Sequence, residues 1–196
     1  MEDICAVILA AGQGSRFQAA AGAGQDKLMA NCRGLDGRER PLLEQVLVNL
    51  QGVVGRRLLV TRPERSEVIA LARAYGCEVL TLDSPGMGDS IAAAVRASFD
   101  QAGWLVLLGD MPFIAPQTIA QIAASITDEK ISVADYAGEY GHPVGFGRSF
   151  ARRLAALSGD RGGRHLFDAS NLQVIGVEDP GVIRDVDTPA ALNFEK

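Results

Sequence analysis

A glycine-rich turn directly after the first apolar segment has the residue types that bind phosphate groups. Gly12 and Gly14 lie in this turn, and glycine lets backbone N–H groups approach a ligand closely. Such N–H groups bind phosphate oxygens. Arg16 would add a guanidinium for the same oxygens, and Lys27 follows the Ala- and Gly-rich segment 18–26 as a second cation. We therefore expect the turn to bind an anionic group and segment 18–26 to be mobile.

The same residues disfavour two common nucleotide-binding patterns. Phe17 occupies the position of the third glycine of the GxGxxG fingerprint, and no Gly-Lys-Ser/Thr follows at the spacing of a P-loop. A nicotinamide or flavin oxidoreductase on a Rossmann sheet is therefore disfavoured. The simplest alternative is an ordinary turn between a strand and a helix, with an arginine that faces solvent.

Aspartates at two distant places in the chain could bind a divalent metal ion. Asp110 comes just after the apolar segment 104–108, and an acid at the carboxyl end of a buried strand is well placed for a ligand site. Asp185 and Asp187 would project to the same side of an extended segment. Mg²⁺ prefers oxygen ligands such as carboxylates and phosphates. Each aspartate could also be a turn or cap residue, so a shared metal site is a hypothesis.

Three further segments combine glycine or proline with polar side chains. Segment 84–91 opens an Ala-rich helix, which Asp89 or Ser90 could simply cap. His142 precedes a proline, and a lone histidine is more often structural than chemical. Arg164 ends a Gly-rich stretch and could meet a phosphate at the start of a helix.

The elements that must position these residues alternate between strands and helices. Short apolar runs predict strands, and apolar positions at helical spacing predict helices. The predicted strands are residues 4–10, 57–61, 78–82, 104–108, 131–135, 142–147 and 172–176. The predicted helices are residues 41–50, 64–75, 89–102, 116–126 and 149–157. This order predicts an α/β fold with three αβα layers and a mostly parallel mixed sheet, whose ligand site lies beyond the carboxyl ends of the strands.

Length, composition and charge narrow the class of protein further. The 196 residues suit one domain, with 47% hydrophobic residues, 22% charged residues and a net charge of -5. The acidic balance argues against a nucleic-acid partner. No apolar run reaches the roughly 18 residues of a membrane span, and the N-terminus does not resemble a secretory signal. We therefore expect no membrane partner and a cytoplasmic location, with Cys5, Cys32 and Cys77 reduced and mostly buried.

Together, these motifs resemble those of the MobA-like nucleotidyltransferases. The run from Leu9 to Phe17 resembles the LAxGxGxRF/M signature of that family, and Asp110 and Asp187 lie in runs similar to its LGDMP and D(I/V)DTPxDL motifs. The other segments are similar to its GMxxSL, GHPV(G/L)F and GDxGAR segments, in the same order. The family usually has a proline before the lysine, where this chain has Asp26.

The resemblance implies a fold and a division of labour along the chain. The expected fold is the Rossmann-like, GT-A type of nucleotidyltransferase. Residues 1–196 would form a single domain, in which residues 1–130 bind the nucleotide and residues 131–196 bind the acceptor.

The resemblance also implies a role for each candidate residue. Asp110 and Asp187 would bind Mg²⁺, with Asp185 in support. The expected catalytic residues are Arg16, Lys27, Asp110 and Asp187. The expected nucleotide-binding residues are Leu9, Ala10, Ala11, Gly12, Gly14, Ser15, Arg16, Lys27, Gly88, Asp89, Ser90 and Asp110. The expected acceptor-binding residues are His142, Pro143 and Arg164.

Within the family, the run Ala10-Ala11-Gly12 resembles the branch that uses CTP, the molybdenum cofactor cytidylyltransferases. This implies the Mg²⁺-dependent transfer of CMP from CTP to the terminal phosphate of molybdopterin, with release of pyrophosphate. A molybdoenzyme or its chaperone would then be a further partner. Three alternatives stay open: a GTP-using guanylyltransferase, a transferase for another phosphorylated acceptor, and a non-catalytic carrier of molybdenum cofactor.

Overall fold

The computed structural model describes residues 3–22, 24–83 and 86–192. The first two residues of the chain, residues 84–85 of segment 84–91 and the last four residues of the expected domain lie outside the described residues.

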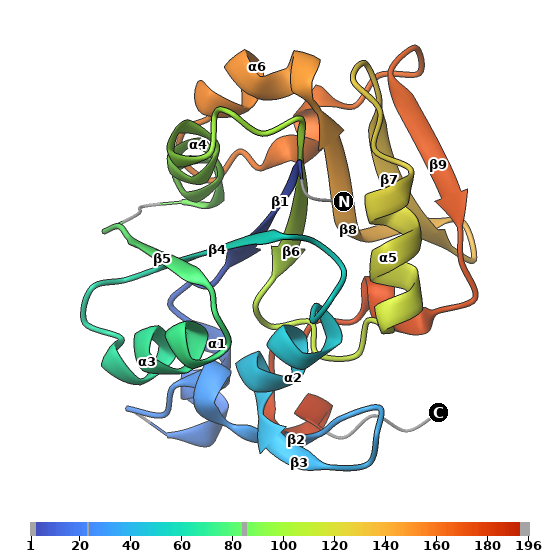
Figure 1. The fold of residues 1–196 in the computed structure, drawn as a ribbon. Coiled ribbons are helices and arrows are strands. Elements are labelled where there is room, and N and C mark those ends of the chain that lie inside the picture. The colour runs from blue at the N-terminus through green and yellow to red at the C-terminus, as the bar shows by residue number, and fades with distance from the viewer. Residues whose placement is uncertain (1–2, 23, 84–85, 193–196) are drawn as a thin grey trace.

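A seven-stranded sheet forms the middle layer, in the order β5-β4-β1-β6-β8-β7-β9 (Figure 1). The strands are β1 (Ile4–Leu9), β4 (Arg56–Thr61), β5 (Glu78–Thr81), β6 (Gly103–Leu108), β7 (Ile131–Tyr136), β8 (Glu139–Gly147) and β9 (Leu172–Gly176). Only β8 runs against its neighbours β6 and β7 within this sheet, and the other paired strands are parallel. The sheet is therefore mixed and mostly parallel, which confirms the expected fold class.

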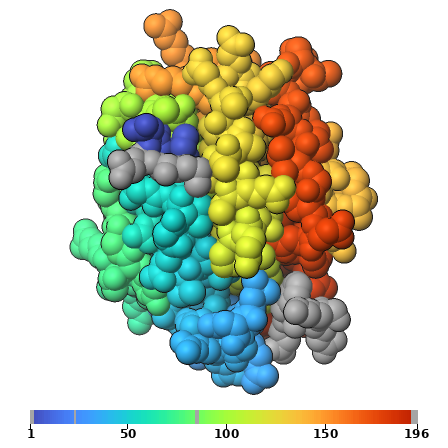
Figure 2. Space-filling view, turned by 45° about the vertical axis from the view of Figure 1, so that its right-hand side comes forward, coloured from blue at the N-terminus to red at the C-terminus, as the bar shows by residue number. Residues whose placement is uncertain are grey.

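Helices cover both faces of the sheet because alternate strand residues point to opposite sides. The helices are α1 (Ser15–Ala21), α2 (Leu42–Asn49), α3 (Ser66–Ala74), α4 (Met87–Ala97), α5 (Pro116–Ala124) and α6 (Ala151–Ala155). Ile8 packs with the buried side chains of α2, α3 and α5, whereas its neighbour Val7 packs with those of α4 and α6. On the surface, α2, α5 and β9 lie side by side (Figure 2). The two hydrophobic cores, one on each face, therefore fix the positions of the strands. The candidate residues lie near the carboxyl ends of the parallel strands.

Helix α1 occupies the first part of segment 18–26, since alanine is the best helix former. Three local expectations were wrong. Pro41 ends strand β3 (Glu39–Pro41), which pairs with β2 (Asn31–Arg33) in an unexpected hairpin, and the following helix begins one residue later. Helix α4 ends at Ala97, well before residue 102. The helix expected over 149–157 is a single turn of 3-10 helix followed by the short α6.

The remaining structural expectations concern cysteines and membrane spans. Cys5, Cys32 and Cys77 are free and buried, as expected. Burial raises the pKa of the Cys5 thiol to about 11 and that of the Cys32 thiol likewise to about 11. Within the described residues, the structure contains no helix with the length and apolar character needed to cross a membrane.

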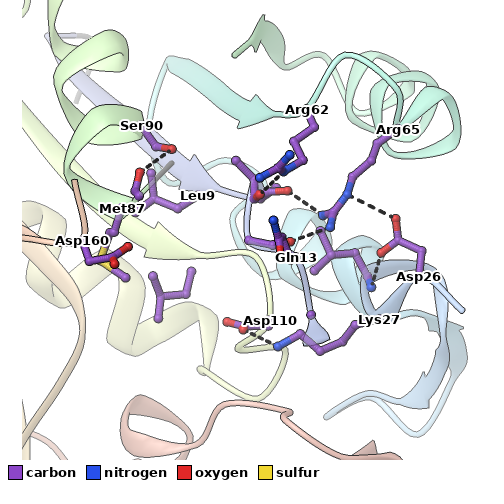
Figure 3. A pocket seen from close by; sticks show the side chains of 17 residues that line it. Leu9, Gln13, Asp26, Lys27, Arg62, Arg65, Met87, Ser90, Asp110 and Asp160 are labelled. Carbon is purple, nitrogen blue, oxygen red and sulfur yellow. Dashed lines mark hydrogen bonds and ion pairs between the residues drawn. The ribbon is translucent and has the colours of Figure 1, made fainter. Parts of the chain in front are cut away.

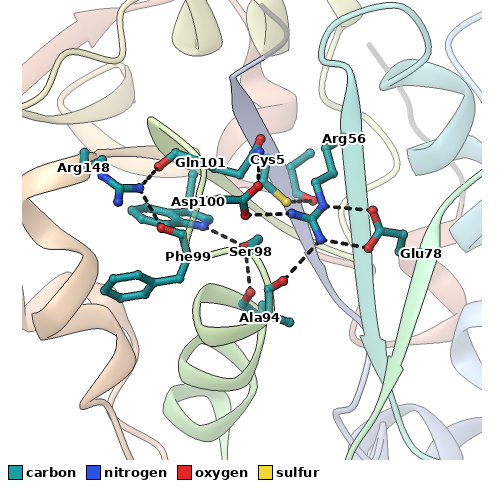
Figure 4. A network of polar contacts seen from close by, with 12 residues as sticks. Cys5, Arg56, Glu78, Ala94, Ser98, Phe99, Asp100, Gln101 and Arg148 are labelled. Carbon is teal, nitrogen blue, oxygen red and sulfur yellow. Dashed lines mark hydrogen bonds and ion pairs between the residues drawn. The ribbon is translucent and has the colours of Figure 1, made fainter.

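A buried hydrogen-bond chain joins β6 to the end of α4 (Figure 4). The indole N–H of Trp104 donates to Ser98 Oγ at 2.9 Å, and that hydroxyl donates to the carbonyl of Ala94 at 2.7 Å. Trp104 and Ser98 are fully buried. Beside them, Arg56 bonds to Glu78 and Asp100, which links β4 to β5. The indole N–H of Trp104 and the hydroxyl of Ser98 are therefore both paired.

Substituting Ser98→Ala should lower the free energy of unfolding by about 1–3 kcal/mol, because the buried indole N–H loses its acceptor. The measurement is urea denaturation of the wild type and the variant, with Ser125→Ala, another serine that bonds to a backbone carbonyl at a helix end, as a comparison. A variant as stable as the wild type would show that the indole N–H finds another partner. Trp104 lies at the start of β6, whereas Asp110 follows its end, so the substitution should change stability without disturbing the candidate site.

Candidate active site

The glycine turn after β1 borders a cavity of ≈ 440 Å³. Gly14 adopts a φ of 64°, a left-handed conformation that favours glycine and turns the chain into α1. The cavity is lined by the ends of β1 and β6, the turn itself, the start of α4 and the short 3-10 helix Lys27–Met29. The expected nucleotide-binding residues on its wall are Leu9, Ala10, Ala11, Gly12, Gly14, Lys27, Ser90 and Asp110. The structure therefore brings eight of the twelve expected residues around one cavity.

The other four expected nucleotide-binding residues lie away from the described cavity wall. Gly88 and Asp89 face the loop that follows α6 instead: Gly88 N donates to Gly159 O at 2.8 Å, and Asp89 Oδ2 accepts from Gly159 N at 3.0 Å. Successive helical residues point in different directions, so Met87 and Ser90 reach the cavity while the two residues between them do not. Ser15 begins α1, and the exposed side chain of Arg16 lies beside Asp187.

Three carboxylates meet where β6 ends. One oxygen from each of Asp110, Asp185 and Asp187 can be chosen so that all lie within 4.8 Å of one another. A backbone hydrogen bond from Val186 N to Asp110 O, at 2.9 Å, joins the two segments. Val186 is only 1% exposed and anchors its segment in the core, so its two acidic neighbours project to the other side, as alternation along an extended chain requires.

Two basic side chains contact these carboxylates. Lys27 Nζ lies 2.7 Å from Asp110 Oδ2 (Figure 3). It also lies 3.3 Å from Asp187 Oδ1, and the lysine side chain is only 10% exposed. Arg16 Nη1 lies 2.5 Å from Asp187 Oδ2, but the arginine side chain is 80% exposed. Partial burial by itself would raise the pKa of Asp187, but the hydrogen bond from Arg16 and the charge of Lys27 outweigh it and lower that pKa.

The acidic cluster fits a hard divalent cation. Its donors are all carboxylate oxygens, which suit Mg²⁺ or Mn²⁺ better than softer metals. Three carboxylates against two cationic side chains leave one negative charge in excess. The cluster also borders the cavity through Asp110, so a cation bound there would face any ligand in the cavity. Asp110, Asp185 and Asp187 are therefore the residues that could hold a metal.

A second cavity of ≈ 280 Å³ adjoins the first, and Met87 lines both. Its wall includes the aromatic rings of Tyr140, Phe146 and Phe167, with Arg164 beside them. His142 also lines it, and its Nδ1 lies 3.4 Å from Val106 O.

His142 lines this second cavity, whereas its neighbour Pro143 does not. Burial is the main cause that lowers the pKa of His142, so its imidazole is neutral at pH 7. Pro143 is buried and is not among the residues that line the second cavity. Of the expected acceptor-binding residues, His142 and Arg164 therefore face a common space and Pro143 does not.

The sequence motifs did not indicate five polar residues on the wall of the first cavity, which are Gln13, Asp26, Arg62, Arg65 and Asp160. Gln13 lies inside the turn, and Asp26 caps the 3-10 helix that carries Lys27 by accepting from Leu28 N at 3.0 Å. Arg62 and Arg65 come just after β4. The signal that could have found the two arginines is their place at the carboxyl end of a parallel strand.

Comparison with known proteins places this geometry among nucleotidyltransferases. A family model described as the MobA-like NTP transferase domain matches residues 6–174. The bifunctional protein GlmU of Aromatoleum aromaticum is 30% identical over 144 residues, which cover 72% of this chain and 29% of the relative. The chain spans about a third of the length of the curated relatives it matches.

Two solved structures have the same fold over nearly the whole chain. A nucleotidyl transferase from Methanothermobacter is 21% identical, with a TM-score of 0.80 over 97% of this chain and 94% of that one. Rv0371c from Mycobacterium tuberculosis, solved as a complex with manganese, is 26% identical, with a TM-score of 0.70 over 96% of this chain and 95% of that one. These likenesses confirm the three-layer nucleotidyltransferase fold.

Proposed function

Because the chain belongs to the MobA-like NTP transferase family and is a nucleotidyltransferase, we propose that it transfers CMP from CTP to the terminal phosphate of molybdopterin. The observation that carries the proposal is the cluster of Asp110, Asp185 and Asp187 beside the glycine turn, with Lys27 between them. Such a site can neutralise a triphosphate and orient it for attack by another anion.

The reaction is an in-line displacement at the α-phosphorus of CTP. An oxygen of the acceptor phosphate forms a bond to the α-phosphorus, and the bond from that phosphorus to the bridging oxygen of the β-phosphate breaks. The electron pair leaves with pyrophosphate, whose charge is stabilised by the N–H groups of the glycine turn and by Lys27 and Arg16. The acceptor phosphate is already ionised at neutral pH, so no strong general base is needed.

A divalent metal completes this charge neutralisation. Asp110 and Asp187 would hold Mg²⁺, with Asp185 in support, and the bound ion would polarise the α-phosphate. The manganese complex of the mycobacterial relative supports a divalent metal in this family.

The second cavity is the proposed acceptor site. Its three aromatic rings suit a flat heterocycle such as a pterin, and Arg164 offers a guanidinium for a phosphate. Because Met87 borders both cavities, an acceptor there would lie next to the nucleotide. Residues 1–130 would then bind the nucleotide and residues 131–196 would supply most of the acceptor site, while Asp187 joins Asp110 in the acidic cluster that borders the first cavity.

The choice of CTP over GTP rests on Ala11, which lines the first cavity and is 8% exposed. Its side chain is one methyl group larger than the glycine of the LAGG sequence. The proposal is that this methyl group narrows the nucleotide site in favour of the smaller pyrimidine base.

The test incubates the protein with Mg²⁺, molybdopterin and each of the four ribonucleoside triphosphates, and follows the release of pyrophosphate. We expect release with CTP at least tenfold faster than with GTP, and none without the acceptor. Release with GTP alone would make the protein a guanylyltransferase. Release only when molybdopterin is replaced by a sugar phosphate would change the acceptor. Binding of molybdopterin without any release would favour the carrier.

A further inference from the structure

Two arginines that follow β4 donate hydrogen bonds to backbone carbonyl groups of the glycine turn. Arg62 Nε donates to Ala11 O at 3.0 Å, while Arg65 Nη1 donates to Ala10 O at 2.9 Å and its Nη2 to Gly12 O at 2.5 Å (Figure 3). Three consecutive carbonyl groups of the turn therefore accept from guanidinium groups. Both arginine side chains are largely buried, with exposed fractions of 17% and 13%.

These contacts determine where the amides of the turn point. In a trans peptide unit the C=O and the following N–H point in opposite directions. With the three carbonyls directed at the arginines, the N–H groups of Ala11, Gly12 and Gln13 point away from them. Among the hydrogen bonds of the described residues, none is donated by these three N–H groups. Consecutive unpaired N–H groups form a concave site for an anion.

Arg65 also connects the turn to the segment that carries Lys27. Its Nε lies 3.6 Å from Asp26 Oδ2, and the other oxygen of that carboxylate accepts from Leu28 N at 3.0 Å. Asp26 is thus both the cap of the 3-10 helix and the partner of Arg65. One guanidinium therefore sets the distance between the amides of the turn and the buried ammonium of Lys27.

The position of Arg65 is itself determined by local structure. Its N–H donates to Arg62 O at 3.2 Å in the turn around Pro63, and its own carbonyl accepts from Ile69 N in the first turn of α3. Only a planar guanidinium with several donors can reach two carbonyls and a carboxylate at once, whereas a lysine is a single point charge.

We propose that Arg65, assisted by Arg62, is a positioning residue that turns the amides of residues 11–13 outwards as an anion site and aligns them with Lys27. This inference rests on the proposed binding of a nucleoside triphosphate by this site. The polyphosphate chain is the part of the ligand that the aligned amides and ammonium recognise. Loss of Arg65 should therefore weaken binding of polyphosphate much more than binding of a nucleoside monophosphate.

The test compares Arg65→Met, Arg65→Lys and the wild type by isothermal titration with CTP, GTP, CMP and pyrophosphate, each with Mg²⁺. Arg73→Met is the matched control, because Arg73 is an exposed arginine of helix α3, which begins directly after Arg65. We expect Arg65→Met to weaken CTP and pyrophosphate at least about tenfold, the effect of losing roughly one charge-assisted hydrogen bond to the site. Binding of CMP should weaken less than about threefold. The affinities of Arg65→Lys should lie between those of the wild type and Arg65→Met, and the control should match the wild type.

The outcomes separate this inference from the proposed function. If Arg65→Met binds CMP, CTP and pyrophosphate more weakly by the same factor, Arg65 has a merely structural role. Unchanged affinity for pyrophosphate would overturn the inference outright. If the wild type binds pyrophosphate but neither CTP nor GTP, the proposed function fails, while a selective loss of pyrophosphate binding in Arg65→Met would still support the inference. If Arg65→Met is unfolded by circular dichroism, Arg65→Lys decides the matter, with a loss of about threefold or more expected for pyrophosphate.

Discussion

Substitution of Asp110 by asparagine should reduce the rate of nucleotide transfer by about 10³-fold or more. The side chain keeps its shape but loses the charge that could bind a metal and that contacts Lys27 Nζ at 2.7 Å. Removal of one preorganised electrostatic group from a transfer site typically costs about 10²–10³ in rate, and here the metal is weakened as well. The measurement is the release of pyrophosphate from CTP with Mg²⁺ and molybdopterin.

Two further measurements make the Asp110 result specific. Mn²⁺ binding, followed by electron paramagnetic resonance, should weaken in Asp110→Asn together with turnover. The control is Asp128→Asn, which removes an exposed acid after α5 and should change neither property. Turnover of Asp110→Asn near that of the wild type, with an unchanged circular dichroism spectrum, would refute the metal site.

Replacement of Lys27 by methionine should have opposite effects on catalysis and on metal binding. The ammonium of Lys27 is buried and contacts both Asp110 and Asp187. It therefore fills the space of a divalent cation and neutralises the negative charge that would attract one. Without it, two carboxylates lose a compensating charge, and Mn²⁺ should bind about tenfold more tightly in the absence of nucleotide. Turnover should nevertheless fall by about 10²-fold or more, because the triphosphate loses a cation.

The Lys27 experiment uses the same two assays on the same preparations. Lys130→Met is the control, since Lys130 is an exposed lysine whose Nζ donates to Ser170 O. It precedes β7, whereas Asp110 follows β6, which runs in the same direction. Weaker Mn²⁺ binding in Lys27→Met would contradict the idea of a resident counter-cation. Normal turnover with tighter Mn²⁺ binding would remove Lys27 from the catalytic residues but leave the electrostatic argument intact.

Local patterns predicted most of the elements and the family. The alternation of apolar strands with amphipathic helices produced the correct fold class, because strand burial and helical periodicity are local properties. Predictions were poorest where alternatives of similar energy compete over a few residues. The strand that ends at Pro41 was missed, since three-residue strands carry almost no periodic signal.

Helix orientation explains why the structure separates the candidate residues at the start of α4. Gly88, Asp89 and Ser90 were expected to act together on the nucleotide. The structure directs Ser90 to the first cavity and Asp89 to Gly159 N, because adjacent helical residues face different neighbours. Which face of α4 meets which loop depends on its packing against α6, and no short motif contains that information.

By itself, the sequence determined the apolar strands, the glycine turn and the acids that follow strand ends, since each depends on residues close together along the chain. Only the tertiary structure decided which of these residues meet. Lys27 is 83 residues from Asp110 and 160 from Asp187. These three come together because Val186 N bonds to Asp110 O just after β6, and the 3-10 helix that begins at Lys27 packs beside them. The hydrogen bonds of Arg65 to the glycine turn also form only because β1 and β4 are neighbours. No local pattern indicates these bonds, because their acceptors are backbone carbonyl groups, which every residue has.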